Sequence, residues 1–505
     1  YEISLGLVGS EMCIRDRERR DNMGILSKLE PNRVFYYFEE ICQIPHGSTN
    51  TKEISDYCVN FAKEHGLRVQ QDDANNVIIW KNGSQGYEDH APVMLQGHMD
   101  MVCEKEADCD IDMQTQGLDL QLEDNVISAR GTTLGGDDGI AVAYALAILE
   151  STDIPHPPLE VVFTVDEEIG MLGAAALDMS PLKARTMLNM DSEDEGYLLV
   201  SCAGGLTAKA HLPVKRDSVT DVSYMQLTVN GLLGGHSGVE IDKGRANANI
   251  MLGRALYELA QDCEYKIVSI EGGKKDNAIP REAHAVLAVK NGDVAAASAK
   301  VKALQEIYRK EYCHTDAEIT VTIDRASQDI TCDPMDRETT ERIVTALMNL
   351  PNGIQNMSFA VEGLVQTSLN LGIMMTDAQE VCLSYSVRSS VETQKEYLVE
   401  QISCLVKRLG GTVTCIGEYP AWEYREQSPL RDKMIEIFEK QYGRKPIVQA
   451  LHAGVECGLF AGQLPGLDCV SFGPDMKDIH TPKETMDVGS VERTWNYVLE
   501  ILRNL

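Results

Sequence analysis

Apolar residues along the chain follow two spacings, which alternate from about residue 29 onward. Short, nearly continuous apolar runs predict strands at residues 75–80, 91–97, 158–165, 186–191 and 196–203. Segments with helical spacing lie between several of these runs, and the most apolar of them reads DDGIAVAYALAILEST. Strands that are apolar along their whole length are typical of a parallel sheet with helices on both faces. The pattern therefore predicts an α/β domain with a mostly parallel central sheet.

The pattern changes after residue 205 and changes back near residue 393. Between these points strand patterns come in pairs between helical ones, which predicts an α+β domain with one antiparallel sheet. We therefore expect a first domain at residues 23–205 that is interrupted by a second domain at 206–392 and completed by residues 393–505. A separate third domain at 393–505 is the alternative, and the positions of the candidate site residues favour the interrupted first domain.

Residues 1–22 fit neither pattern. Their segment EMCIRDR resembles a translated sequencing adapter, so we treat residues 1–22 as a non-native leader and expect the native start at Met23. A genuine extension would leave the other predictions unchanged.

The chain of 505 residues is strongly acidic, with 78 aspartates and glutamates against 46 lysines and arginines and a formal net charge of −32. Such a surface repels phosphate groups, so nucleic acids and anionic membranes are poor partners. The 14 cysteines are scattered without a paired spacing, and the sequence shows no secretory signal or membrane-length apolar run. We therefore expect a cytoplasmic protein with free thiols.

Five short stretches place histidines or carboxylates at the end of an apolar run. They read VMLQGHMDMV (93–102), TTLGGDDGI (132–140), FTVDEEIGM (163–171), LNMDSEDEG (188–196) and KDIHTPKE (477–484). Open α/β sheets bind ligands at the carboxyl ends of their strands, so the five stretches are expected to meet. In the first stretch, the alternation of side chains along a strand directs His98 and Asp100 the same way.

The residues in these stretches suit a site for two zinc ions. Carboxylates from Asp137, Glu168 and Asp191, with a shared hydroxide, balance the charge of two Zn²⁺. His98 and His480 add neutral nitrogen donors, and Asp137 would be shared by both metals. Co²⁺ and Mn²⁺ are alternative metals, because the sequence does not fix the choice.

Two further acidic residues would act beside the metals. Asp100 can accept the ring N–H that a metal-binding histidine leaves unused, and so can orient His98. Glu167 can take a proton from an attacking water and pass it to a leaving amine.

The motifs GHMDMV, TTLGGDDGIA, DEEIGMLGA, LNMDSEDEG and GGHSGVEIDKGRANAN together resemble the M20 metallopeptidase family, and in particular its bacterial dipeptidases. The resemblance runs from about Met23 to the C-terminus. It implies a zinc-peptidase domain interrupted by a lid or dimerisation domain, with the five residues above as metal ligands and Glu167 as the general base. It also implies a cis peptide after Asp137. The family more often has alanine and asparagine where this chain has Gly136 and Asp138.

The resemblance further implies substrate contacts in the inserted domain. His236 would help to polarise the scissile carbonyl, while Asn247 and Arg388 would hold the free carboxylate of the substrate, which an arginine fork suits. The plain alternatives are a turn histidine, a helix-capping asparagine and a surface arginine. His452 and Glu456 are four residues apart, so a helix would place them on one face. Glu456 would then meet a substrate amino group, or the pair is structural.

These features predict a di-zinc dipeptidase that cleaves short unblocked dipeptides, including Xaa-His, and that pairs into a homodimer through the inserted domain. An amidase acting on N-acyl amino acids is the alternative within the enzymes. An acidic contact to the substrate amino group favours dipeptides, whereas an apolar pocket favours acyl groups. A non-catalytic metal-binding scaffold is the alternative outside the enzymes, and it would be expected to lack a ligand or Glu167.

Overall fold

The computed structural model describes residues 24–326, 330 and 332–505, so the predicted leader at residues 1–22 lies outside the described residues. By packing, the chain forms two compact units. Of the described residues, unit 1 contains 24–200, 425–449 and 459–505, and unit 2 contains those within 201–424 and 450–458. The domain limits given above stay a prediction. Residues 393–424 pack with unit 2, because their strand pairs with its sheet.

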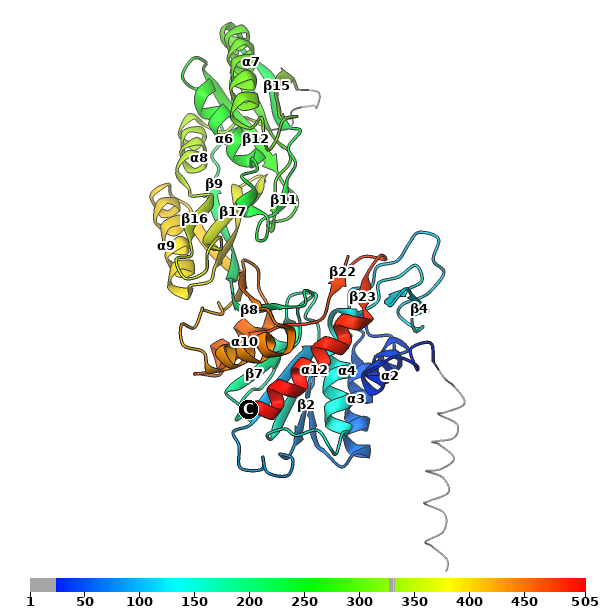
Figure 1. Ribbon diagram of the computed structural model, residues 1–505. Coiled ribbons are helices and arrows are strands. Elements are labelled where there is room, and N and C mark those ends of the chain that lie inside the picture. The colour runs from blue at the N-terminus through cyan, green and yellow to red at the C-terminus, as the bar shows by residue number, and fades with distance from the viewer. Residues whose placement is uncertain (1–23, 327–329, 331) are drawn as a thin grey trace, which may run out of the picture. The chain divides into compact units, whose positions relative to one another are not determined.

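Unit 1 is built on a mixed eight-stranded sheet (Figure 1). Its strand order is β1–β2–β6–β3–β7–β21–β8–β20. The four neighbours at its centre run parallel to one another: β6 (Leu159–Thr164), β3 (Val93–His98), β7 (Thr186–Asn189) and β21 (Asp468–Ser471). The outer strands are β1 (Arg68–Gln71), β2 (Val77–Lys81), β8 (Tyr197–Cys202) and β20 (Ile447–Leu451). The predicted α/β class with a mostly parallel sheet is confirmed.

Helices cover this sheet, and α4 (Gly136–Glu150) is the most deeply buried of those described. Every residue from Gly136 to Leu149 is buried, because α4 packs against β3 and against its neighbouring helices. The Tyr144 hydroxyl donates to the Val491 carbonyl at 2.9 Å, which ties α4 to the C-terminal helix. The other helices of the unit are α2 (Asn32–Cys42), α3 (Lys52–Glu64), α5 (Leu172–Ala176), α10 (Pro429–Tyr442) and α12 (Val488–Asn504).

A small four-stranded sheet accompanies the large one. Its order is β22 (Met476–Lys477), β23 (Thr485–Asp487), β5 (Val126–Ala129) and β4 (Leu120–Glu123). The loop between β22 and β23 carries His480, so this sheet fixes one of the predicted site residues.

Unit 2 is built on an antiparallel sheet of nine strands. The strand order is β15 (Thr320–Arg325), β10 (Val222–Asn230), β14 (Ala283–Lys290), β12 (Tyr265–Gly272), β17 (Val365–Thr376), β18 (Glu380–Ser389), β9 (Gly204–Pro213) and β19 (Thr412–Tyr419), with β16 (Gly353–Met357) paired to β17. The helices on it are α6 (Ala248–Leu259), α7 (Val294–Glu311), α8 (Arg337–Asn349) and α9 (Glu392–Arg408). One continuous apolar core joins helices and sheet. The predicted antiparallel sheet is present.

The remaining elements are short. They are β11 (Gly235–His236), which pairs with β13 (Ala278–Ile279), the 3₁₀ turns η1 (Ile241–Lys243) and η2 (Asn291–Asp293), and α11 (Glu456–Gln463). Within the described ranges, no helix combines the length and the apolar character needed to cross a membrane.

Candidate metal centre

The candidate metal centre lies where parallel strands of unit 1 end. His98 is the last residue of β3, Glu168 lies in the turn after β6, and Asp191 lies two residues beyond β7. These strands are neighbours in the sheet and point the same way, so their following loops meet at one edge. Gly97 precedes His98, and a Cβ there would lie 2.5 Å from Asp138 Oδ2, so glycine allows the close approach of α4.

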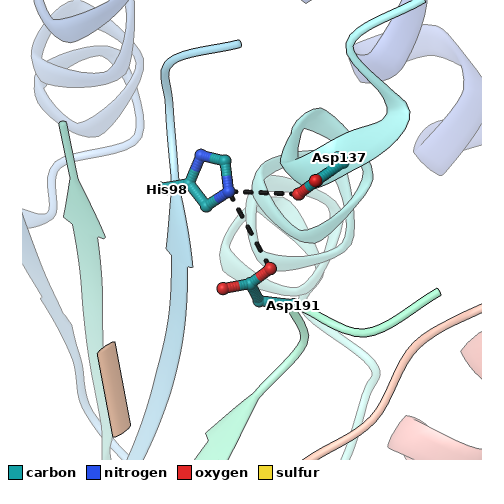
Figure 2. Close-up of side chains that lie close together, drawn as sticks. All are labelled: His98, Asp137 and Asp191. Atoms are coloured by element: carbon teal, nitrogen blue, oxygen red, sulfur yellow. Dashed lines mark hydrogen bonds and ion pairs between the residues drawn. The ribbon is translucent and has the colours of Figure 1, made fainter. Parts of the chain in front are cut away.

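Two groups of potential metal ligands share Asp137. Figure 2 shows the first group, in which His98 Nε2 lies 3.1 Å from Asp137 Oδ1 and 3.8 Å from Asp191 Oδ1. In the second group, His480 Nε2 lies 3.1 Å from Asp137 Oδ2 and 2.9 Å from Glu168 Oε1. Within each group the candidate ligand atoms lie within 4.8 Å of one another. The two oxygens of Asp137 therefore face different histidines, as a residue shared by two metals would require.

Asp137 reaches this position because the start of α4 is irregular. Asp137 and Asp138 have non-helical backbone angles, and the peptide bond between them is cis, as the family resemblance implies. Asp138 takes a different role from its neighbour. Its Oδ2 accepts the main-chain N–H of His98 at 3.2 Å, and complete burial raises the pKa of Asp138 well above its ordinary value. Of the two adjacent aspartates, Asp137 is therefore the one whose two oxygens face both histidines.

The charges in this cluster suit a cation. Burial disfavours the charged form of His98, yet hydrogen bonds with Asp100 and Asp137 outweigh it and raise the pKa of His98 well above its ordinary value. Asp137 and Glu168 raise the pKa of His480 to about 10. Burial would raise the pKa of Asp137, but its two histidine partners lower it below the ordinary range. The carboxylates thus draw protons onto both imidazoles, and a divalent metal would replace those protons. Imidazole and carboxylate are the donors that zinc and similar metals use, so the residues fit such an ion.

Asp100 holds two parts of the centre together. The His98 Nδ1–H donates to the main-chain carbonyl of Asp100 at 2.9 Å, and the Asp100 carboxylate is farther from this nitrogen, at 3.5 Å. The carboxylate instead accepts from Ser48 Oγ at 2.9 Å and from the main-chain N–H of Glu167 at 3.1 Å. The predicted orientation of His98 by Asp100 thus runs mainly through the backbone, while the carboxylate positions Glu167, which is half-buried.

Sequence reasoning did not single out three residues around this centre. Ser48 lies in the loop IPHGST, which has no ligand-like spacing. Glu193 lies half-buried two residues beyond Asp191, and this partial burial together with the charge of Asp137 raises the pKa of Glu193 to about 7. Glu484 is buried four residues after His480 and accepts main-chain N–H groups at the start of α4. Glu193 and Glu484 stood inside motifs already noted, but only the fold shows what they contact.

A second cluster lies in unit 2 around Arg388, which is only 9% exposed and therefore not a surface arginine. Its Nη1 donates to the Tyr419 hydroxyl at 3.0 Å, while its Nε has no hydrogen-bond partner among the described residues. His452 Nε2 lies 2.7 Å from Ser368 Oγ. Burial, followed by the charge of Arg388, lowers the pKa of His452 to about 3 and also lowers the pKa of His236. This cluster is cationic and suits an anion.

Asn247 caps a helix. Its side-chain oxygen accepts the main-chain N–H groups of Asn249 and Ile250 at the start of α6, at 3.0 and 3.2 Å. Its amide group donates to Asn370 Oδ1 at 3.0 Å and to the Leu371 carbonyl at 3.1 Å. The capping alternative is therefore present, and a contact with substrate would require one of the two donated bonds to break.

His452 and Glu456 do not share a helix face. His452 lies in the loop before α11, and Glu456 is the first residue of that helix. The helical relation considered from their spacing is wrong, because residues 452–455 are not helical and the helix begins only at Glu456. Both side chains are nevertheless buried in unit 2.

The mixed sheet, the histidine and carboxylate groups at its strand ends and the separate antiparallel unit are features of a metallopeptidase. The chain belongs to peptidase family M20/M25/M40, whose family model matches residues 94–504. It is 36% identical over 485 residues to the cytosol non-specific dipeptidase of Escherichia coli strain K12, which covers 96% of this chain and 99% of the relative.

Solved structures agree with this assignment. The crystal structure of aminoacylhistidine dipeptidase from Vibrio alginolyticus matches with a TM-score of 0.89 at 34% identity, over 96% of this chain and 99% of that one. Aminopeptidase PepT from Bacillus cereus matches with a TM-score of 0.52 at 17% identity, over 94% of this chain and 98% of that one, which shows a shared fold.

Proposed function

We propose that the protein is a metal-dependent dipeptidase that cleaves short dipeptides with free ends, including those with a C-terminal histidine. The observation that carries the proposal is Asp137, whose two oxygens each face a different histidine in a separate ligand group. Such sharing supports two-metal hydrolysis. The two similar proteins named above as dipeptidases, from E. coli and V. alginolyticus, support the substrate class.

The proposed metals are two zinc ions. His98 and Asp191 would hold one, Glu168 and His480 the other, and Asp137 both. When bound, zinc lowers the pKa of a coordinated water to near 7 and polarises a carbonyl oxygen. The remaining tasks fall to the protein, which must hold these ligands, move a proton and bind the two ends of the peptide.

Glu167 is proposed as the residue that moves the proton. It would take a proton from the attacking water and return it to the amine nitrogen as the C–N bond breaks. The Asp100 carboxylate accepts the main-chain N–H of Glu167 and the hydroxyl hydrogen of Ser48, so Asp100 would fix the position of this segment. His98, oriented through the carbonyl of Asp100, belongs to the same arrangement.

Arg388 is proposed to receive the free carboxylate of the substrate, with His236 polarising the scissile carbonyl. Arg388 is buried and cationic and has an N–H group without a partner among the described residues, which supports an anionic ligand. An amidase for N-acyl amino acids would use the same carboxylate contact. The amino end of the substrate therefore separates the two functions, and Glu456 is the acidic residue proposed to meet it.

We also propose that the protein works in the cytoplasm and forms a homodimer through unit 2. The free state of all described cysteines suits a reducing compartment, and the E. coli relative is named for the cytosol. Light scattering on the purified chain would measure the dimer directly, and a monomer at micromolar concentration would contradict it.

The function is tested by stripping the full chain of metal and titrating Zn²⁺ back. Hydrolysis of β-alanyl-histidine, a panel of α-dipeptides and one N-acetylated amino acid is followed at each step. We expect activity on the free dipeptides to reach its maximum at two zinc ions per chain. Cleavage of only the acetylated compound would make the protein an amidase, and tight binding of two ions without turnover would favour a scaffold.

A further inference from the structure

One buried carboxylate connects two loops that carry candidate metal ligands. Glu484 Oε2 accepts the main-chain N–H groups of Leu134 and Gly135 at 2.8 and 3.2 Å, and its Oε1 accepts that of Gly136 at 2.8 Å. Glu484 is only 2% exposed. Helix α4 begins at Gly136 and receives no side-chain cap from the preceding Gly135, so a residue 348 positions further along the chain satisfies its first N–H group.

The second of these loops, between β22 and β23, has a strained backbone at its candidate metal ligand. His480 lies between β22 and β23, whose pairing joins Met476 to Met486 and Lys477 to Thr485. The backbone of His480 is left-handed, with φ of 61°, and non-glycine residues keep this sparsely populated conformation only where their surroundings impose it. Glu484 ends this loop, four residues after His480.

Both loops are thus fixed to each other by one side chain. On the first loop, Gly136 immediately precedes Asp137. On the second loop, Glu484 follows His480 and also closes a turn by donating its main-chain N–H to the Thr481 carbonyl at 3.0 Å. The three hydrogen bonds that main-chain N–H groups donate to this buried carboxyl group are directional and shielded from water, so they hold the two loops firmly.

We propose that Glu484 is a positioning residue that sets Asp137 and His480 at the separation needed to bind the second metal ion. It contacts neither reacting atoms nor substrate in this role. The inference rests on the proposed two-metal function and deepens it. The first ligand group depends less on Glu484, because strand β3 holds His98 and Asp191 lies two residues beyond strand β7, so that only the shared Asp137 is held through Glu484.

The test is a comparison of metal binding by the wild type and by Glu484→Gln. Glutamine keeps the size of the side chain but offers one acceptor oxygen and places an NH₂ group against main-chain N–H donors. Stepwise Zn²⁺ binding is measured by competition with a chromophoric chelator, and the absorption of Co²⁺ reports the geometry of each ion. For Glu484→Gln we expect the affinity for the ion at the His98 and Asp191 group to stay within threefold of wild type. The affinity for the second ion, at the Glu168 and His480 group, should be at least tenfold lower.

Glu160 provides a matched control. It is also a buried carboxylate, 4% exposed, and accepts main-chain N–H groups from Lys183 and Ala184, but it lies at the start of β6, whereas the metal centre follows the end of that strand. Glu160→Gln should leave the affinities for both ions unchanged even if it lowers the melting temperature of the metal-free protein. Glu484→Asp keeps the charge and should recover part of the affinity for the second ion.

The outcomes separate the inference from the function on which it rests. If the wild type binds two ions and Glu484→Gln binds both equally tightly, the role of Glu484 is wrong and the function stands. If Glu484→Gln weakens both ions alike, with a loss of melting temperature like that of Glu160→Gln, the role is only structural. If the wild type binds fewer than two ions, the two-metal function fails and the inference fails with it.

Discussion

The histidines of the two candidate sites have pKa values shifted in opposite directions. In unit 1, carboxylates surround His98 and His480 and raise the pKa of both imidazoles. In unit 2, burial and the neighbouring charge of Arg388 lower the pKa of His236 and His452. The first cluster holds excess negative charge and the second holds a buried positive charge. The same side-chain type is thus placed among groups that suit a cation in unit 1 and among groups that suit an anion in unit 2, and the difference lies in its neighbours.

Under the proposed function, the two units would have separate tasks. A peptide substrate has a carbonyl to be attacked and a free carboxylate to be held. The acidic cluster would suit the first task once it holds metal, and the cationic cluster would suit the second. If this division holds, changes in unit 1 should act on the chemical step, and changes in unit 2 should act on substrate binding.

The largest expected effect comes from Glu167→Gln. The variant should keep both metal ions but lose about 10²–10⁴-fold in kcat, because glutamine cannot accept the proton of the attacking water. Steady-state kinetics with metal analysis of the same samples measures both quantities. Asp166→Asn is the matched control, since Asp166 is the preceding acid and its Oδ1 accepts the main-chain N–H of Thr49, which asparagine can also do. A near wild-type kcat for Glu167→Gln would show that Glu167 is not the general base.

A smaller effect is expected from Arg388→Ala, which tests the anion site of unit 2. Loss of a charge-assisted hydrogen bond of about 1.5–3 kcal/mol should raise KM about 10- to 100-fold with little change in kcat. A dipeptide amide, which lacks the free carboxylate, supplies the control. For the wild type, KM should be higher for the amide than for the dipeptide by a similar factor. For Arg388→Ala, KM should be about the same for both compounds. If the increases in KM caused by the variant and by the amide instead multiply, Arg388 contacts another part of the substrate.

The sequence predicted the two clusters unequally, and the reason is physical. His98 ends an apolar strand, Glu168 and Asp191 lie just beyond two others, and the shared direction of these parallel strands brings the residues together. The hydrogen bonds that Glu484 accepts from the start of α4 join loops that are far apart in sequence, and no local spacing encodes such a contact.

In unit 2 the sequence was less informative, because short polar segments allow several structures. Asn247 shows the difficulty, since the same residue suits a substrate contact and a helix cap, and the structure shows the cap. The spacing of His452 and Glu456 suggested a shared helix face, but α11 begins only at Glu456. Chemistry-bearing residues at strand ends were thus easier to locate than those in loops.

The smallest expected effect concerns His452 and the stability of unit 2. Its folded pKa of about 3 lies below the value near 6.5 of an unfolded chain, so on acidification the unfolded state takes up the proton first. Wild-type stability should therefore fall as the pH drops below about 6.5, by about 2 kcal/mol between pH 7 and pH 5 from this residue alone. His452→Gln lacks the titrating group but can still hydrogen-bond Ser368, so it should lose about that much less stability over the same interval. Urea unfolding at both pH values, with chelator present, measures the difference. Equal losses for the two proteins would mean that folding leaves the pKa of His452 near its ordinary value, and His236 would then be the only histidine of unit 2 left in the contrast.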